Sequence, residues 1–176
     1  MFSDPQKNLE QLKLLPGQFV ADLGAGSGAY TLAAAKMVGP QGRVYAVDVM
    51  KEMLQKLKNT AIVSRLLNVE TLWGDIEKLG GTRLADASVD VALLCNSLFQ
   101  MEDKNTLSLE IKRILKSGGR LLLVDWKESF GGMGPQPGHV VSLGDAKSIF
   151  EKAGFQFERE ISAGAHHYGL IFRRNP

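Results

Sequence analysis

Cysteine is almost absent from this sequence, which has one cysteine in 176 residues. Cys95 stands at the end of an apolar run that begins at Val91. A single buried thiol excludes a disulfide framework, and it also excludes a cysteine cluster that would bind zinc or an iron–sulfur centre. We therefore expect a reducing, cytoplasmic location.

The sequence also lacks an excess of either charge and lacks a long apolar run. Its 21 Lys and Arg balance 19 Asp and Glu to a net charge of +2, so a nucleic-acid partner is not favoured. No stretch approaches the roughly 18 apolar residues of a membrane span, and the polar start, residues 1–8, does not resemble a secretion signal. The length predicts one domain over residues 17–176, preceded by a helical arm over residues 1–16.

Short apolar runs alternate with segments of helical period, which is typical of an α/β fold with a parallel sheet. The clearest helical period joins Leu107, Ile111, Ile114 and Leu115, and Gly118–Gly119 is placed to cap that helix. Other helices are expected over residues 6–15, 29–38 and 51–58, and around 146–153 behind a capping pair at Ser142 and Asp145. The expected strands are 19–23, 44–47, 69–73, 89–94, 120–124, 156–160 and 168–172.

A glycine-rich turn joins the first expected strand to the next helix, with the sequence Asp22-Leu-Gly24-Ala25-Gly26-Ser-Gly28. Glycine permits both a tight turn and a close approach of a ligand to the backbone, and the helix N-terminus offers free N–H groups. The same segment also fits the dinucleotide fingerprint. However, an acid at position 22 would repel a pyrophosphate, whereas it suits a ligand with an ammonium or sulfonium charge.

With its third glycine, this motif resembles the first motif of the class I S-adenosylmethionine-dependent methyltransferases. The resemblance covers almost the whole chain, and it is strongest to the small ubiquinone/menaquinone-type and type 11 methyltransferases through Leu115-Lys-Ser-Gly-Gly119. It implies a Rossmann-like, doubly wound sheet of seven strands in the order 3-2-1-4-5-7-6, with an antiparallel last strand. The implied cofactor is S-adenosylmethionine, which is converted to S-adenosylhomocysteine.

Asp48 ends the second expected strand, 20 residues after Gly28. Its two carboxylate oxygens match two adjacent hydroxyl groups, and the family places an acid here that binds the cofactor's ribose. Val49 and Met50 follow, either against the adenine or in the core.

The family resemblance also implies roles for residues at the ends of the third and fourth strands. Asp75 would accept a hydrogen bond from the adenine amino group, and the backbone N–H of Ile76 would meet a ring nitrogen. Cys95 or Asn96 would present a backbone carbonyl to the cofactor's amino group. The complete expected cofactor site is Asp22, Gly24, Ala25, Gly26, Gly28, Tyr30, Asp48, Val49, Met50, Gly74, Asp75, Ile76, Cys95 and Asn96.

On the acceptor side, methyl transfer is an in-line displacement that depends on positioning and needs a general base only if the acceptor must lose a proton. The candidates are His139 in the Gly/Pro-rich loop, Asp125 at the end of the fifth strand, and Asn96. We interpret His166 and His167 as structural. Asn96 and Asp125 do not reproduce the carboxylate set of metal-dependent catechol enzymes, so no metal is expected, and one cysteine argues against an arsenite type.

The sequence thus predicts a methyltransferase with an unidentified acceptor, and a small molecule is favoured. The arm before the first strand is shorter than the lid of the families it resembles, so the acceptor site is either open or completed by a second copy or a partner subunit. Two alternatives stay open. One is a nicotinamide-dependent oxidoreductase that uses the same glycine loop, and the other is a non-catalytic cofactor-binding subunit that activates a partner.

Overall fold

The computed structural model describes residues 3–176, so Met1 and Phe2 of the expected arm lie outside the described residues. The strands are β1 (Phe19–Leu23), β2 (Arg43–Asp48), β3 (Val69–Trp73), β4 (Val89–Cys95), β5 (Leu115–Trp126), β6 (Phe155–Ile161) and β7 (His167–Arg174). The α-helices are α1 (Pro5–Leu12), α2 (Ala29–Val38), α3 (Lys51–Val63), α4 (Lys104–Ile114) and α5 (Leu143–Lys152). Two short 3-10 helices, η1 (Leu98–Gln100) and η2 (Pro137–His139), complete the elements.

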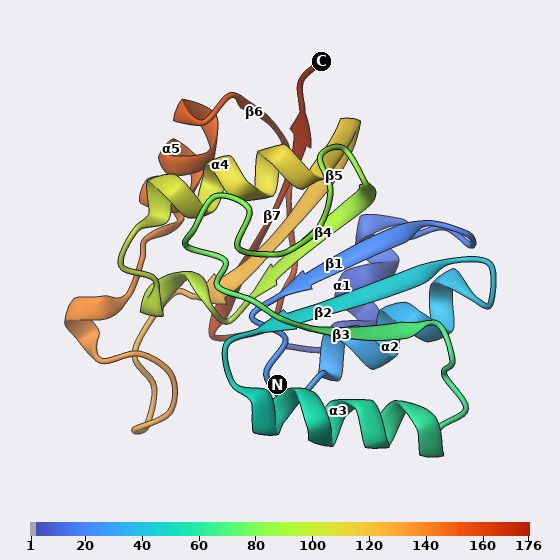
Figure 1. Ribbon diagram of the computed structural model, residues 1–176. Coiled ribbons are helices and arrows are strands. Elements are labelled where there is room, and N and C mark those ends of the chain that lie inside the picture. The colour runs from blue at the N-terminus through green and yellow to red at the C-terminus, as the bar shows by residue number, and fades with distance from the viewer. Residues whose placement is uncertain (1–2) are drawn as a thin grey trace.

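The seven strands form one sheet in the order β3-β2-β1-β4-β5-β7-β6, which confirms the expected order. The pairs from β3 through β5 are parallel, and β7 is antiparallel to both β5 and β6. The parallel pairs put the carboxyl ends of β1 to β5 at one edge, at the lower left of Figure 1. Ligands in open α/β sheets bind beyond this edge.

Both faces of the sheet are covered, which explains why its central strands read as continuous apolar runs. In β4 the side chains of Ala92 and Leu94 enter the core shared with α4 and α5, whereas Val91 and Leu93 enter the core shared with α1 and α2. Figure 1 shows α4 and α5 over one face of the sheet and α1 and α2 behind the other. No helix in residues 3–176 has the length and hydropathy of a membrane span.

The end of α4 differs from the prediction. The helix stops at Ile114, and Leu115 already has extended backbone angles as the first residue of β5. The carbonyl groups of Arg113 and Ile114 accept hydrogen bonds from the backbone N–H groups of Ala87 and Ser88 in the loop before β4, so no glycine cap is needed. Gly118, with φ +73°, lies instead where the β4–β5 register shifts between Val89 and Val91.

Two other helices have different bounds from those expected. α1 ends at Leu12 because Lys13 adopts a left-handed conformation with φ 58°, and Leu15 is exposed. α3 continues to Val63, beyond the expected end at Lys58, and its last turns include the buried Ala61. α1 is bound to β5 and β6, because Arg120 of β5 and Arg159 of β6 donate hydrogen bonds to its last carbonyl groups.

A candidate ligand cavity at the carboxyl ends of the strands

A cavity of about 490 Å³ lies at the carboxyl ends of β1 to β4. It is lined by every expected cofactor residue except Gly28: Asp22, Gly24, Ala25, Gly26, Tyr30, Asp48, Val49, Met50, Gly74, Asp75, Ile76, Cys95 and Asn96. Sequence reasoning missed the remaining lining residues, which are Ser3, Pro5, Ser27, Ala29, Glu77, Ser97, Gln100 and Met101. Ser3 and Pro5 come from the arm, and Ser97, Gln100 and Met101 lie in or next to η1, whose position no motif specified.

The three glycines of the first turn have different structural roles. All have positive φ, and a Cβ on Gly24 would lie 2.6 Å from Ser97 Oγ. By contrast, a Cβ on Gly26 would meet nothing closer than the Gly24 carbonyl oxygen at 4.0 Å. Gly24 therefore allows the turn to lie close to Ser97 after β4, whereas Gly26 leaves its backbone open to a ligand.

Gly28 lies behind the cavity, and its replacement tests the loop. A Cβ there would lie 2.1 Å from Leu57 Cδ1, and the residue has φ +80°. We expect Gly28→Ala to destabilise the fold by about 2–4 kcal/mol, from overpacking together with left-handed strain. Urea unfolding measures this. Gly138→Ala is the control, because no atom lies within 4 Å of its new Cβ and its φ is not positive. Equal stability of the two variants would contradict the prediction.

Asp48 ties the glycine loop to the end of β2. Its Oδ2 accepts a hydrogen bond from the Gly26 N–H at 2.9 Å, and its Oδ1 accepts one from the Met50 N–H at 2.8 Å. Each carboxylate oxygen keeps a further lone pair for a ligand. Val49 and Met50 are 58% and 57% exposed, which excludes the core alternative and places both at the cavity wall.

The turn after β3 is built around close backbone approaches. The Asp75 N–H donates to the Gly81 carbonyl at 3.1 Å, and a Cβ on Gly81 would lie 1.9 Å from the Asp75 carbonyl oxygen. The Asp75 carboxylate accepts a hydrogen bond from the Glu77 N–H at 3.0 Å and pairs with Lys78 at 3.2 Å. Asp75 therefore has a local turn role as well as a place in the cavity wall.

Asp22 is a buried carboxyl at the cavity wall. Thr31 Oγ1 donates a hydrogen bond to its Oδ2 at 2.5 Å. Burial raises the pKa of Asp22 from 3.8 to about 6, against the effect of the Thr31 hydrogen bonds. A positively charged group in the cavity would stabilise its ionised form.

Tyr30 connects the cavity to the arm. Its hydroxyl shares a hydrogen bond of 2.7 Å with Ser3 Oγ and accepts one of 2.7 Å from Asn8 Nδ2. Burial raises the pKa values of the Tyr30 hydroxyl and of the Cys95 thiol above their ordinary range. Both groups are therefore protonated at neutral pH.

The end of β4 turns sharply at Asn96, which has φ 56° and donates its N–H to the Val124 carbonyl at 2.8 Å. Its buried Oδ1 has no hydrogen-bond partner within the described part of the chain. A buried oxygen of this kind costs free energy unless a ligand donates to it. Together with the open backbone at Gly26 and the carboxylates of Asp22 and Asp48, it fits a ligand that carries hydroxyl and ammonium donors.

The structure does not bring all three acceptor-side candidates together. Asn96 lines the cavity, whereas Asp125 and His139 do not. Asp125 is fully buried and accepts backbone hydrogen bonds, and His139 is an exposed residue of η2. His166 pairs with Glu128 at 2.7 Å, and His167 packs on Trp126 with ring centroids 4.2 Å apart.

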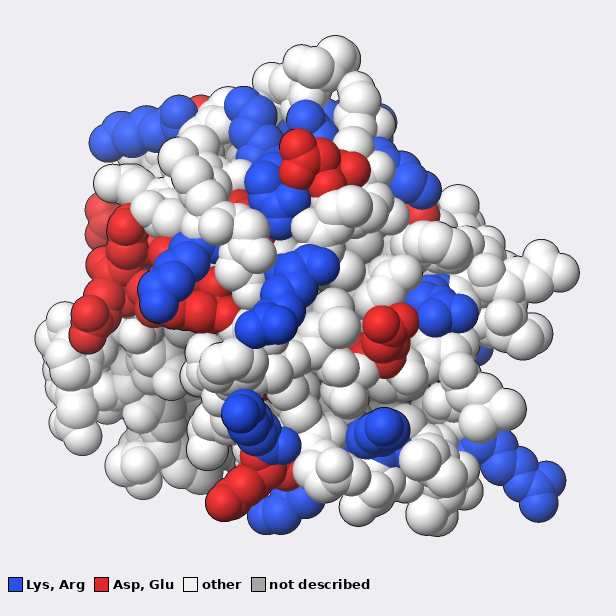
Figure 2. All heavy atoms as spheres, in the orientation of Figure 1, with Lys and Arg blue, Asp and Glu red and all other residues white. Residues whose placement is uncertain are grey.

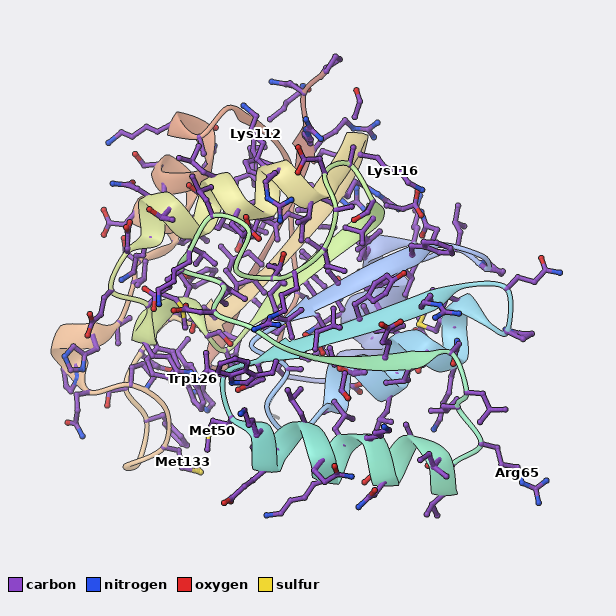
Figure 3. All side chains as sticks on the ribbon, in the orientation of Figure 1. Met50, Arg65, Lys112, Lys116, Trp126 and Met133 are labelled. Carbon is purple, nitrogen blue, oxygen red and sulfur yellow. The ribbon has the colours of Figure 1, made fainter. Side chains whose placement is uncertain are left out.

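In Figure 3, Trp126 and Met50 lie at the edge that holds the carboxyl ends of the strands, while Lys112 and Lys116 lie towards the opposite edge. Residues 3–176 contain no group of three or more His, Cys, Asp and Glu side chains placed to hold a metal ion.

Comparison with known proteins gives the family. A family model described as a methyltransferase domain matches residues 15–156. An arsenite methyltransferase of Halobacterium salinarum is 29% identical over 157 residues, which are 81% of this chain and 38% of that protein. A ubiquinone/menaquinone biosynthesis C-methyltransferase of Burkholderia mallei is 30% identical over 120 residues, which are 68% of this chain and 48% of that protein. The chain thus spans less than half of the curated relatives it matches.

A solved structure agrees with this result over nearly the full chain. The crystal structure of an S-adenosylmethionine-dependent methyltransferase from Aquifex aeolicus superposes with a TM-score of 0.89 at 31% identity, and the match covers 98% of this chain and 90% of that one. The chain belongs to the methyltransferase-domain family, within the class I S-adenosylmethionine-dependent methyltransferases that its motifs resemble.

Proposed function

We propose that this chain is an S-adenosylmethionine-dependent methyltransferase that transfers a methyl group to a small acceptor by in-line displacement. The observation that supports it best is the convergence on one cavity of the glycine loop, Asp48, Asp75 and the turn at Asn96, which come from the ends of four different strands. No separate catalytic domain is required for this chemistry, because positioning and water exclusion supply most of the rate.

In this proposal the expected cofactor residues have the following roles. Asp48 accepts hydrogen bonds from both ribose hydroxyls, and Asp75 and the Ile76 N–H bind the adenine edge. Val49 and Met50 pack against the adenine face. Gly24, Ala25 and Gly26 lie along the methionine part, and Asp22 faces its positive charge. The carbonyl group of Cys95 or Asn96 accepts from the amino group.

S-adenosylmethionine supplies, when bound, an electrophilic methyl group on a sulfonium. The chain's own residues then orient the cofactor and exclude water. Tyr30, Ser3 and Pro5 close the cavity on the side of the arm. Because Tyr30 and Cys95 keep their protons at neutral pH, neither removes a proton from the acceptor. Asn96 Oδ1 is the group that we propose to receive a hydrogen bond from the acceptor.

The charged side chains in the cavity wall are all acidic. The described lining residues include Asp22, Asp48, Asp75 and Glu77 but no Lys, Arg or His, and Lys78 neutralises only Asp75. These acids suit the ammonium and sulfonium groups of the proposed cofactor. On the face seen in Figure 2, Lys and Arg are spread with Asp and Glu between them rather than gathered in one block. A second copy or partner that completes the acceptor side, and the cytoplasmic location, stay predictions.

Calorimetric titration with S-adenosylhomocysteine tests the proposal. We expect one site with micromolar affinity, and absence of binding at high micromolar concentration would exclude this function. Parallel titration with NAD⁺ and NADH tests the oxidoreductase alternative. Incubation with methyl-labelled cofactor and fractionated cell extract then asks which fraction gains label. Cofactor binding without label transfer, together with capture of a stoichiometric partner subunit, would favour the non-catalytic alternative.

Asp22 gives a prediction in which stability and binding change in opposite directions. Burial raises the pKa of Asp22 in the folded protein to about 6, above its ordinary value of 3.8. The free energy of unfolding therefore falls as the pH rises from about 4 to 6, because the carboxyl ionises more readily in the unfolded chain. We expect Asp22→Asn to stabilise the fold by about 2 kcal/mol at pH 7.5, and this gain fades between about pH 6 and pH 4. The same variant binds S-adenosylmethionine more weakly. Denaturation at both pH values and calorimetry measure the pair of effects, and a destabilised variant at pH 7.5 would contradict the burial cost.

A further inference from the structure

Asp125 lies outside the cavity but contacts an element that forms part of its wall. It is fully buried at the end of β5, and its Oδ2 accepts a hydrogen bond from the Phe99 N–H at 3.0 Å. Its Oδ1 accepts from the Trp126 N–H at 2.7 Å. The Leu98 N–H also bonds to this carboxylate. Leu98 and Phe99 begin η1, so one buried carboxylate on β5 holds the first N–H groups of the helix that follows β4.

The same short helix supplies two side chains to the cavity. Gln100 ends η1 and Met101 follows it, and both line the cavity. The far end of this segment is also fixed, because Lys104 Nζ donates to the Met101 carbonyl at 2.5 Å and the Asp103 N–H donates to Glu77 Oε1 at 2.6 Å. The segment from Leu98 to Met101 is therefore held at its start by Asp125, which is the one charged side chain of the described residues that bonds there. Its end is held by Lys104 of α4 and by Glu77 of the β3–β4 loop.

We propose that Asp125 is a positioning residue, whose carboxylate holds η1 so that Gln100 and Met101 form one wall of the cofactor cavity. This inference rests on the proposed function, since it takes S-adenosylhomocysteine as the ligand of that cavity. It replaces the expectation that Asp125 acts directly on the acceptor.

The electrostatic surroundings of Asp125 support a carboxylate that responds to pH. Burial raises its pKa from 3.8 to about 6, against the backbone N–H groups and the nearby Lys104 of α4. Cys95 of β4 and Tyr168 of β7 also face it, and Asp145 of α5 faces Tyr168. Below about pH 6 a proton occupies one carboxyl oxygen, and that oxygen then accepts more weakly from the backbone.

Calorimetric titration with S-adenosylhomocysteine at pH 7.5 tests the inference in Asp125→Asn. The amide replaces one acceptor oxygen with a donor that opposes a backbone N–H. We expect the dissociation constant to rise about threefold to tenfold, which is about 0.7–1.4 kcal/mol. Asp145→Asn is the matched control, since its side chain bonds to Ser142 on the exposed start of α5, and its affinity should match the wild type. Unchanged affinity in Asp125→Asn overturns the inference.

A pH series separates positioning by charge from a general loss of structure. The ratio of the two dissociation constants, Asp125→Asn over wild type, should fall towards one as the pH drops from 7.5 to 5, because the wild-type carboxyl is then neutral too. Effects of Asp22 cancel in this ratio. A ratio that stays constant across the range overturns the role of the charge.

A measurement on the wild-type protein keeps the inference testable if Asp125→Asn does not fold. The amide resonances of Phe99 and Trp126 should titrate together with a midpoint near pH 6, since both N–H groups bond to the same carboxylate. Amide resonances that do not move overturn the inference. A wild-type protein that fails to bind S-adenosylhomocysteine overturns the proposed function instead, and the two failures are thus distinguishable.

Discussion

Replacing Asp48 with alanine is expected to lower the affinity for S-adenosylhomocysteine by tenfold or more. In the proposed binding mode the variant loses charge-assisted hydrogen bonds to two ribose hydroxyls, each worth about 1.5–3 kcal/mol. It also frees the N–H groups of Gly26 and Met50, which Asp48 now holds at 2.9 Å and 2.8 Å. The glycine loop and the start of α3 therefore lose a shared anchor. Calorimetric titration at pH 7.5 measures the loss.

Two further variants separate these causes. Asp48→Asn keeps one acceptor oxygen and should bind with an affinity between those of the alanine variant and the wild type. Asp86→Ala removes an acid that is 80% exposed and lies outside the cavity wall, so its affinity should be unchanged. Wild-type affinity in Asp48→Ala would show that the ribose is bound elsewhere.

Replacing Glu110 with alanine is expected to destabilise the fold by about 3–5 kcal/mol. Glu110 is fully buried in α4, where its carboxylate accepts from the Gly80 N–H, from the N–H and hydroxyl of Thr82, and from Arg113. The variant leaves the Arg113 guanidinium and the loop donors without their common acceptor. Urea unfolding at pH 7 measures the difference. Glu151→Ala is the control, since its pair with Lys147 is 3.9 Å long and exposed, and it should cost less than about 1 kcal/mol.

The pH dependence of this effect has a definite sign. The hydrogen bonds from Arg113 and Thr82 outweigh burial and hold the folded pKa of Glu110 at about 2, below its ordinary 4.5. A lowered carboxyl pKa contributes stability above about pH 4.5, and that contribution is lost as the pH falls through 2. The difference between wild type and Glu110→Ala should therefore shrink in acid. A difference that is independent of pH between 7 and 2 would contradict this account.

Glu110 also affects the cavity wall indirectly, because it holds the loop that contains Gly80 and Thr82. Gly81 lies between its two backbone partners, and its carbonyl accepts from the Asp75 N–H at 3.1 Å. The Asp75 turn thus depends on a carboxylate in α4 that no sequence motif marks. We expect Glu110→Ala to weaken cofactor binding in addition to lowering stability.

The sheet and most of the cavity could be predicted because both follow from local patterns. The strands at Phe19–Leu23 and Val69–Trp73 and the helix at Ala29–Val38 have the expected bounds. All the expected cofactor positions except Gly28 and Tyr30 lie at or just after the carboxyl end of a strand, so parallel pairing brings them to one edge. All of the expected positions except Gly28 line the cavity. Their roles towards the cofactor stay a prediction.

The predictions fail where contacts between residues far apart in the sequence determine the local structure. Leu115 continues the helical period of α4, yet it is extended because it pairs with Val89 of β4. α3 runs past Lys58 through Thr60 and Val63, whose branched side chains weaken the local helix signal. Ser3 is held at the cavity by its hydrogen bond to Tyr30, which is 27 residues away in the sequence. Gln100 and Met101 are held there by the bonds that Asp125 and Lys104 make to η1 and its end. No local pattern in the sequence specifies these bonds.

The position of β7 has a consequence for synthesis on the ribosome. β7 is made after β6 but lies between β5 and β6 in the sheet. Until β7 has left the ribosome, β5 presents an open edge of unpaired backbone groups, and β6 has no neighbour to pair with. An open edge of this kind invites pairing with other chains. The nascent protein can therefore pair β1 to β4 while the other half of the sheet still needs protection from aggregation.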